Sequence, residues 1–178
     1  TNLGASNTTR GLFGGGETPS VSNVIDYITI ASTGNAIDFG NLLAATGGVA
    51  VAASPTRAIW MGGYDASATL NTIQFVEIAT TGNTVDFGDL VTATQNGSCC
   101  SSSTRGVLNG GYAGASISTI TYITMASQGN SIDFGDFTAN RSSTGATSNS
   151  VRGIVAGGGT SNVIDYYIIN HGGTAVDF

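Results

Sequence analysis

The sequence predicts an all-β protein built from four similar units, and two observations carry this prediction. First, an arginine followed by a short apolar run and glycines recurs four times, at spacings of 47, 48 and 47 residues. Second, each copy is followed by an alternating apolar segment and then by Asp-Phe, and no stretch shows a helical apolar period. A fixed period near fifty residues is typical of repeat architectures, in which each unit buries its apolar face against its neighbours.

Each unit reads as four strands in order. We expect the first strand in a small, polar stretch such as 144–151, and the second in the apolar run that follows the arginine and stops at a double glycine. The third is the alternating segment, whose β-branched and aromatic residues suit a half-buried strand. A Gly-Asn turn, Gly34-Asn35 in the first unit, then leads into the fourth strand. Because Gly and Asn tolerate positive φ, this pattern predicts a tight hairpin and an antiparallel sheet.

Four-stranded units of this length are typical of the blades of a β-propeller. The sequence therefore predicts one propeller domain over 1–178, with blades at approximately 1–40, 41–88, 89–135 and 136–178. Propellers have roughly four to eight blades. The four units either close the smallest ring, which we favour, or form part of a larger propeller.

The repeated positions resemble the kelch repeat. The double glycines are Gly15-Gly16, Gly62-Gly63, Gly110-Gly111 and Gly158-Gly159. The aromatic residues of the third strands are Tyr27, Phe75, Tyr122 and Tyr166. The fourth strands carry Phe39, Phe87, Phe134 and Phe178, where kelch units usually have tryptophan. The resemblance covers the whole chain and implies the propeller fold, but it implies little about function.

The amino-acid sequence of the repeat is also similar to that of a narrower group of proteins. Segments such as TRGLFGGG and IDYITIASTGNAIDFGNL look like the kelch-like repeats of virion structural proteins in tailed bacteriophages, particularly those that infect marine cyanobacteria. This resemblance implies a component of the virus particle, carried on the capsid, neck, tail or fibre. Its partners would be other virion proteins or copies of itself.

The composition argues against two classes of partner. Charged residues make up only 9% of the chain, lysine is absent and the net charge is −6. Nucleic-acid binding requires clustered Arg and Lys, so we expect no nucleic-acid partner. No apolar run approaches the roughly 18 residues of a spanning helix, so we also expect no membrane insertion.

The residues that could carry chemistry are few. His171 is the sole histidine, so a second imidazole for copper is missing, and no residue is marked as a nucleophile beside it. Cys99 and Cys100 are adjacent, a spacing that cannot staple distant elements and does not match a zinc site. We therefore predict a non-enzymatic protein without a cofactor.

Pairs of aspartates three residues apart raise the question of calcium. Asp86 and Asp89 form one such pair, and Asp133 and Asp136 form another. Calcium takes about six to eight oxygen ligands, usually from a denser acidic loop, and Asn41 replaces the second acid in the first unit. Turn capping is the preferred interpretation of these aspartates, and no metal site is predicted.

The first candidate binding residues are the repeated arginines. They are Arg10, Arg57, Arg105 and Arg152, four of the five arginines in the chain. One interpretation is structural: each guanidinium ties blades together by binding carbonyl groups or the repeat aspartates. The other is a ring of cations that binds an anionic glycan or a partner's carboxylates.

Aromatic residues near the loops are the second set of candidates. Tyr64 and Tyr112 stand in the loops that follow the double glycines, and Trp60 is found only in the second unit. Such loops form one face of a propeller, where partners or sugars usually bind. The alternative interpretation of Trp60 is that it packs between blades and does not bind a ligand. A receptor- or glycan-binding propeller, with a host-surface glycan as ligand, is therefore the alternative to a structural virion protein.

Overall fold

The computed structural model describes residues 4–178 and shows four antiparallel four-stranded sheets arranged as a four-bladed β-propeller. Blade 1 contains β1 (Gly4–Ser6), β2 (Arg10–Gly14), β3 (Val24–Thr29) and β4 (Ile37–Asn41). Blade 2 contains β5 (Ala50–Ala53), β6 (Arg57–Met61), β7 (Thr72–Glu77) and β8 (Val85–Asp89). Blade 3 contains β9 (Ser98–Ser101), β10 (Arg105–Tyr112), β11 (Ser116–Thr124) and β12 (Ile132–Arg141). Blade 4 contains β13 (Gly145–Ser148), β14 (Arg152–Ala156), β15 (Ile164–Ile168) and β16 (Val176–Asp177).

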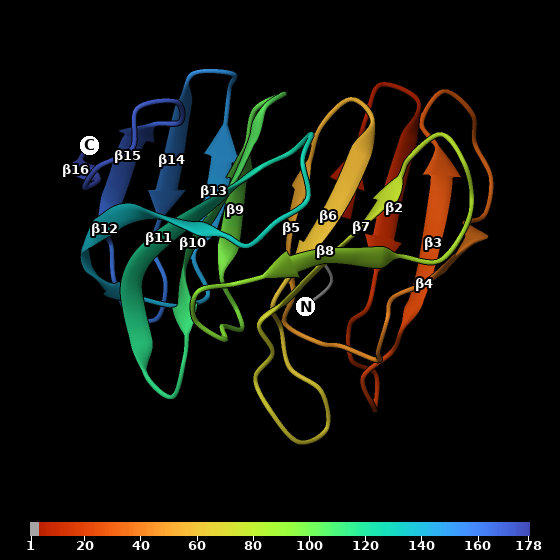
Figure 1. Cartoon of the computed structure of the whole chain (residues 1–178), viewed down its shortest axis with the longest axis horizontal. Coiled ribbons are helices and arrows are strands. Elements are labelled where there is room, and N and C mark those ends of the chain that lie inside the picture. The colour runs from red at the N-terminus through yellow and green to blue at the C-terminus, as the bar shows by residue number, and fades with distance from the viewer. Residues whose placement is uncertain (1–3) are drawn as a thin grey trace.

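The strands of each blade lie in chain order within their sheet, as the sequence predicts. Figure 1 shows the blades side by side in chain order, with blade 1 and blade 4 at opposite ends of the long axis. The outer strands β8 and β12 cross in front of the inner strands in this view (Figure 1). The fold is thus all-β and four-bladed, and its blades follow one another in an arc.

The double glycines lie at or near the end of the second strand of each blade and have a left-handed backbone conformation. Gly62 and Gly63 have φ values of +61° and +100°, which side chains rarely adopt. Their counterparts in blade 4 are Gly157 and Gly158, with φ values of +67° and +98°, one residue earlier than Gly158-Gly159. The three consecutive glycines 157–159 explain this shift, because the sequence alone does not show which two carry the turn.

The connection between the third and fourth strands differs from the expected tight hairpin. In blade 1 it spans residues 30–36, and its turn lies at Thr29–Ser32, where the Ser32 amide donates to the Thr29 carbonyl. Gly34 and Asn35 have no positive φ. In blade 2 the equivalent residues instead contact the preceding blade: the Gly82 amide donates to the Phe39 carbonyl at 2.8 Å.

Three hydrophobic clusters join the blades. Between blades 1 and 2, Leu12, Ile25 and Phe39 pack against Trp60 and Ile78. Equivalent positions form a cluster between blades 2 and 3 and another between blades 3 and 4. No cluster among the described residues joins blade 4 to blade 1, so the four-bladed arc is open there and the closed ring that the repeats suggested is not formed.

Candidate functional site

The four repeated arginines each lie over an aromatic ring of their own blade. The guanidinium carbon is 4.7 Å from the ring centroid for Arg10 over Tyr27 and 4.4 Å for Arg105 over Tyr122. Arg57 and Arg152 lie over Phe75 and Tyr166 in the same way. The ring beneath is in edge contact with the phenylalanine of the fourth strand, as in the Tyr27–Phe39 pair at 5.8 Å. Each blade thus carries an Arg–aromatic–Phe stack.

Three of these arginines also bind the next blade. Arg10 Nη1 donates to the Ile78 carbonyl at 2.8 Å, Arg57 Nη1 to the Met125 carbonyl at 3.0 Å, and Arg105 Nη1 to the Ile169 carbonyl at 2.9 Å. In these three arginines the guanidinium tie between blades is a backbone contact, and no repeat aspartate accepts it. A charge-assisted hydrogen bond to a carbonyl is stronger than a neutral one, so the contact fixes how one blade sits on the next.

Within the part of the chain that the structure describes, Arg152 lies over an aromatic ring of its own blade but makes no hydrogen bond to a following blade. Its guanidinium lies 4.6 Å from the Tyr166 centroid, and no carbonyl of a following blade accepts from it there. The residue is exposed, whereas Arg10, Arg57 and Arg105 are partly buried. The structure therefore separates the four arginines into three blade ties and one available cation.

Trp60, Tyr64 and Tyr112 do not come together. Trp60 is 0% exposed and packs between blades 1 and 2, beside Gly14. Tyr64 Oη donates to Glu17 Oε2 at 2.5 Å, and this hydrogen bond raises the pKa of Tyr64. Tyr112 is 40% exposed at the end of β10 and is the most accessible of the three. A ligand on this side would meet Tyr112 and Tyr64, and Trp60 would be out of its reach.

One hollow lies where the turns between first and second strands meet. It has a volume of about 450 Å³ and is lined by residues of all four blades: 6–8, 53–55, 101–103 and 148–150. Its lining is rich in serine, and the turns hold one another, since Asn7 Nδ2 donates to the Pro55 carbonyl at 3.2 Å. No arginine lines it, so the four guanidinium groups do not form a ring around a central opening.

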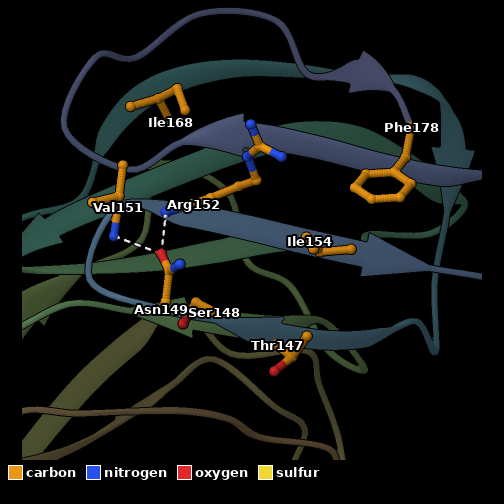
Figure 2. A pocket seen from close by; sticks show the side chains of 8 residues that line it. All are labelled: Thr147, Ser148, Asn149, Val151, Arg152, Ile154, Ile168 and Phe178. Carbon is orange, nitrogen blue, oxygen red and sulfur yellow. Dashed lines mark hydrogen bonds between the residues drawn. The ribbon is translucent and has the colours of Figure 1, made fainter.

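An apolar hollow lies on the outward face of blade 4, the sheet face turned away from blade 3. It measures about 520 Å³, and Figure 2 shows Arg152 between Ile168 and Phe178, with Ile154 beneath them. Phe178 is 66% exposed, whereas its counterparts Phe39, Phe87 and Phe134 are at most 5% exposed. Asn149 Oδ1 accepts from the Val151 and Arg152 amides and shapes the rim. An apolar sheet face with one cation at its centre is suited to a protein partner.

Two buried polar side chains between blades 3 and 4 form hydrogen bonds within the protein. Tyr167 Oη donates to Asn109 Oδ1 at 2.8 Å, and the Cys100 thiol donates to the Thr147 carbonyl at 3.2 Å. Burial raises the pKa of Tyr167, of Cys100 and of Cys99. Both cysteines are free thiols, and these shifts keep them protonated and poorly nucleophilic.

One ion pair was not predicted from the sequence. Arg141, the arginine outside the repeat, donates from Nη2 to Asp165 Oδ2, and both side chains are almost fully buried between blades 3 and 4. The Thr138 hydroxyl also donates to this carboxylate, at 2.9 Å. Arg141 has no counterpart in the other units, and that was the available signal: an unrepeated charge in a charge-poor chain.

The structure and the comparisons add little about chemistry. Among residues 4–178, no three His, Cys, Asp or Glu side chains gather in a way that would hold a metal ion. Within that same range, no helix has the length and apolar character needed to cross a membrane. No protein-family model and no curated protein sequence matches this chain. The four-bladed propeller fold is shown by the four sheets of the structure.

Proposed function

We propose that this chain is a non-enzymatic structural protein of a phage virion, in which the propeller mediates protein–protein contacts on the capsid, neck, tail or fibre. One observation carries the proposal: the outward face of blade 4 is apolar, and Phe178 is 66% exposed on it. An exposed apolar sheet face of this kind is suited to contact with a protein surface. The sequence of the repeats and the absence of lysine are compatible with an assembly module.

The test is sedimentation of native material through a density gradient, followed by peptide mapping of the fraction that contains the chain. A virion component travels with a megadalton particle and stays with it after washing. If all of the chain remains near the top of the gradient while particles sediment, the proposal of a virion protein is overturned.

A receptor- or glycan-binding module is the second candidate, and the exposure of Tyr112 favours it. This ring is 40% exposed at the end of β10, where it is free to stack on a sugar. The candidate predicts saturable binding to a host-surface glycan, lost in Tyr112→Ala and weakened in Tyr64→Ala. Val85→Ala is the control, because Val85 is 51% exposed on β8, in a different blade from Tyr112. A glycan array without signal at high protein concentration rejects this candidate.

A further inference from the structure

We propose that the outward face of blade 4 binds the outward face of blade 1 in a second copy of the chain, so that two copies close a ring of eight blades. The outward face of blade 1 is the sheet face turned away from blade 2, with Phe13, Ile28 and Ile30 on it. This inference rests on the proposed function, since it names the partner of the same surface. Three kinds of contact recur at every blade interface. Blade 4 carries one partner of each contact and blade 1 carries the other.

The first contact is the bond from arginine to the next blade. The acceptors in blades 2, 3 and 4 are the carbonyls of Ile78, Met125 and Ile169. The equivalent residue of blade 1 is Ile30, which is 53% exposed, whereas Ile78 and Ile169 are 0% exposed. The Ile30 amide donates to the Thr9 carbonyl as the Ile78 amide donates to Thr56, so the backbone already has the receptive geometry. Arg152 of one copy therefore fits the Ile30 carbonyl of another.

The second contact joins a glycine amide to the carbonyl of the repeat phenylalanine. Gly82 donates to Phe39, Gly129 to Phe87 and Gly173 to Phe134, at 2.8, 2.7 and 2.6 Å. The remaining members of the two series are Gly34 in blade 1 and Phe178 in blade 4. Gly34 is exposed, and a methyl group placed on it would meet nothing within 4 Å. The series predicts that the Gly34 amide donates to the Phe178 carbonyl of the other copy.

The third contact is apolar. At the interface between blades 2 and 3, Ile59 and Phe87 of one blade meet Leu108, Ile123 and Met125 of the next. Blade 4 presents Ile154 and Phe178 at the first two positions. Blade 1 presents Phe13, Ile28 and Ile30 at the other three, and Phe13 is 41% exposed. Joining the two faces would bury side chains of the types that the internal interfaces already bury.

The geometry favours a second copy over blade 1 of the same chain. Blade 1 and blade 4 lie at opposite ends of the long axis, with blades 2 and 3 between them (Figure 1). Bringing them together within one chain would require the three buried clusters to repack, and close-packed cores resist such deformation. Contact between unlike faces is head-to-tail, and such contacts give closed rings when the rotation closes. Two copies give eight blades, the upper end of the usual range of roughly four to eight.

The first experiment measures the mass of residues 1–178 in solution by light scattering, at tens of micromolar protein. The expected mass is twice the monomer value of 17.8 kDa. Phe178→Asp and Ile30→Asp each place a charge in the proposed contact, and each is expected to reduce the mass to that of the monomer. Val85→Asp is the control, because Val85 is 51% exposed on β8 of blade 2 and lies on neither outward face. Its circular dichroism spectrum, and those of the other variants, check folding.

Mixing the two variants tests the head-to-tail geometry. Each keeps one intact face, so an equimolar mixture of Phe178→Asp and Ile30→Asp can form one unaltered interface. The mixture is expected to recover a species of twice the monomer mass, although neither variant forms it alone. A wild-type chain that stays monomeric, or a mixture that fails to associate, overturns the proposal.

A cysteine pair distinguishes a second copy from closure within one chain. In a chain carrying Gly34→Cys and Phe178→Cys, oxidation is expected to give a covalent species at the dimer position of a denaturing gel, with the oxidised wild type as control. An internal cross-link at the monomer position overturns the proposal. Self-association of a chain that does not sediment with particles would reject the virion function alone. A particle-bound chain covered by another protein would reject the second-copy contact alone.

Discussion

At the scale of single residues, the repeated arginines show how one side chain serves two contacts. Arg105 lies over the Tyr122 ring of its own blade and donates to the Ile169 carbonyl of the next. The sequence predicted a structural role or a cation ring, and it named carbonyl groups or the repeat aspartates as the acceptors in the structural case. It could not identify the carbonyl, because the acceptor lies 64 residues further along the chain.

Removing one of these ties has a predicted cost. Arg105→Ala should lower the free energy of unfolding by about 1–3 kcal/mol, because it loses a charge-assisted hydrogen bond and a cation–π contact. Arg152→Ala is the matched control, since Arg152 has the ring beneath it but no carbonyl acceptor among the described residues. Urea unfolding in dilute protein, where copies do not associate, measures both. Equal losses in the two variants would contradict the role of the carbonyl contact.

The two thiols predict a pH dependence. Burial raises the pKa of Cys99 and of Cys100 above their ordinary value of 9.0. Below that value both folded and unfolded chains hold the thiol protons, and this contribution to stability is fully present. As the pH rises further, the unfolded chain releases protons that the folded chain retains, so the free energy of unfolding falls. The expected loss near pH 9.5 is up to about 1 kcal/mol per thiol.

Urea unfolding in reducing buffer at about pH 8 and pH 9.5 checks this slope. Tyr167 titrates later, because its ordinary pKa is 10.0 and burial raises it further. The variant with Cys99→Ala and Cys100→Ala should therefore lose less stability over the same interval. A double variant with an unchanged slope would show that the thiols do not cause the loss.

At the scale of strands and turns, glycine sets how closely neighbouring blades approach. A Cβ added to Gly88 would lie 2.5 Å from backbone atoms of Gly129, and one added to Gly40 would lie 2.2 Å from the Gly82 oxygen. The sequence suggested glycine in the turn for its positive φ. In the structure the close approach instead requires glycine in the fourth strand, at Gly40 and Gly88, because the turn of the next blade touches the strand there, whereas a Cβ on the turn glycine Gly82 would meet nothing within 4 Å.

Two glycines with the same backbone angle separate these two effects. Gly88 and Gly129 both have φ of +147°, but a Cβ on Gly129 would meet nothing within 4 Å. Gly129→Ala should cost about 1–3 kcal/mol from backbone strain alone. Gly88→Ala should cost a further 1–3 kcal/mol, roughly, because the blades must move apart. Thermal or urea unfolding measures the difference, and equal costs would show that the close approach contributes nothing.

At the scale of the whole molecule, the repeat period was sufficient to predict the four blades and their strand order, because every unit repeats the same alternating pattern. Two features of the candidate site could not be read from it. The open end of the arc depends on the angle between blades, which no local pattern records. The Arg141–Asp165 pair depends on residues that depart from the repeat, and Asp165 resembles Asp26, which stays partly exposed.

This ion pair predicts how the molecule unfolds. Asp165→Ala leaves the Arg141 charge buried without its partner, at a cost of about 3–5 kcal/mol. Because the apolar clusters join only neighbouring blades, the loss should be confined largely to blades 3 and 4. Trp60, the single tryptophan, is buried between blades 1 and 2 and reports on the other end.

In urea, Asp165→Ala should therefore show circular dichroism changing before Trp60 fluorescence. Asp26→Ala is the control, since it makes the same change at the equivalent position of blade 1, where the carboxylate is partly exposed. In Asp26→Ala, circular dichroism and Trp60 fluorescence should change at the same urea concentration. Coincident transitions in Asp165→Ala would instead mean that all four blades unfold as one.

The glycine contact between blades also bears on how such a chain changes over generations. Where Gly88 meets Gly129, backbone touches backbone and no side chain has to match. A unit can therefore follow any other unit at this point without a co-adapted partner. Unequal recombination within the gene, which adds or removes whole units, would preserve the contact each time. The number of units is thus freer to vary than the sequence within one of them.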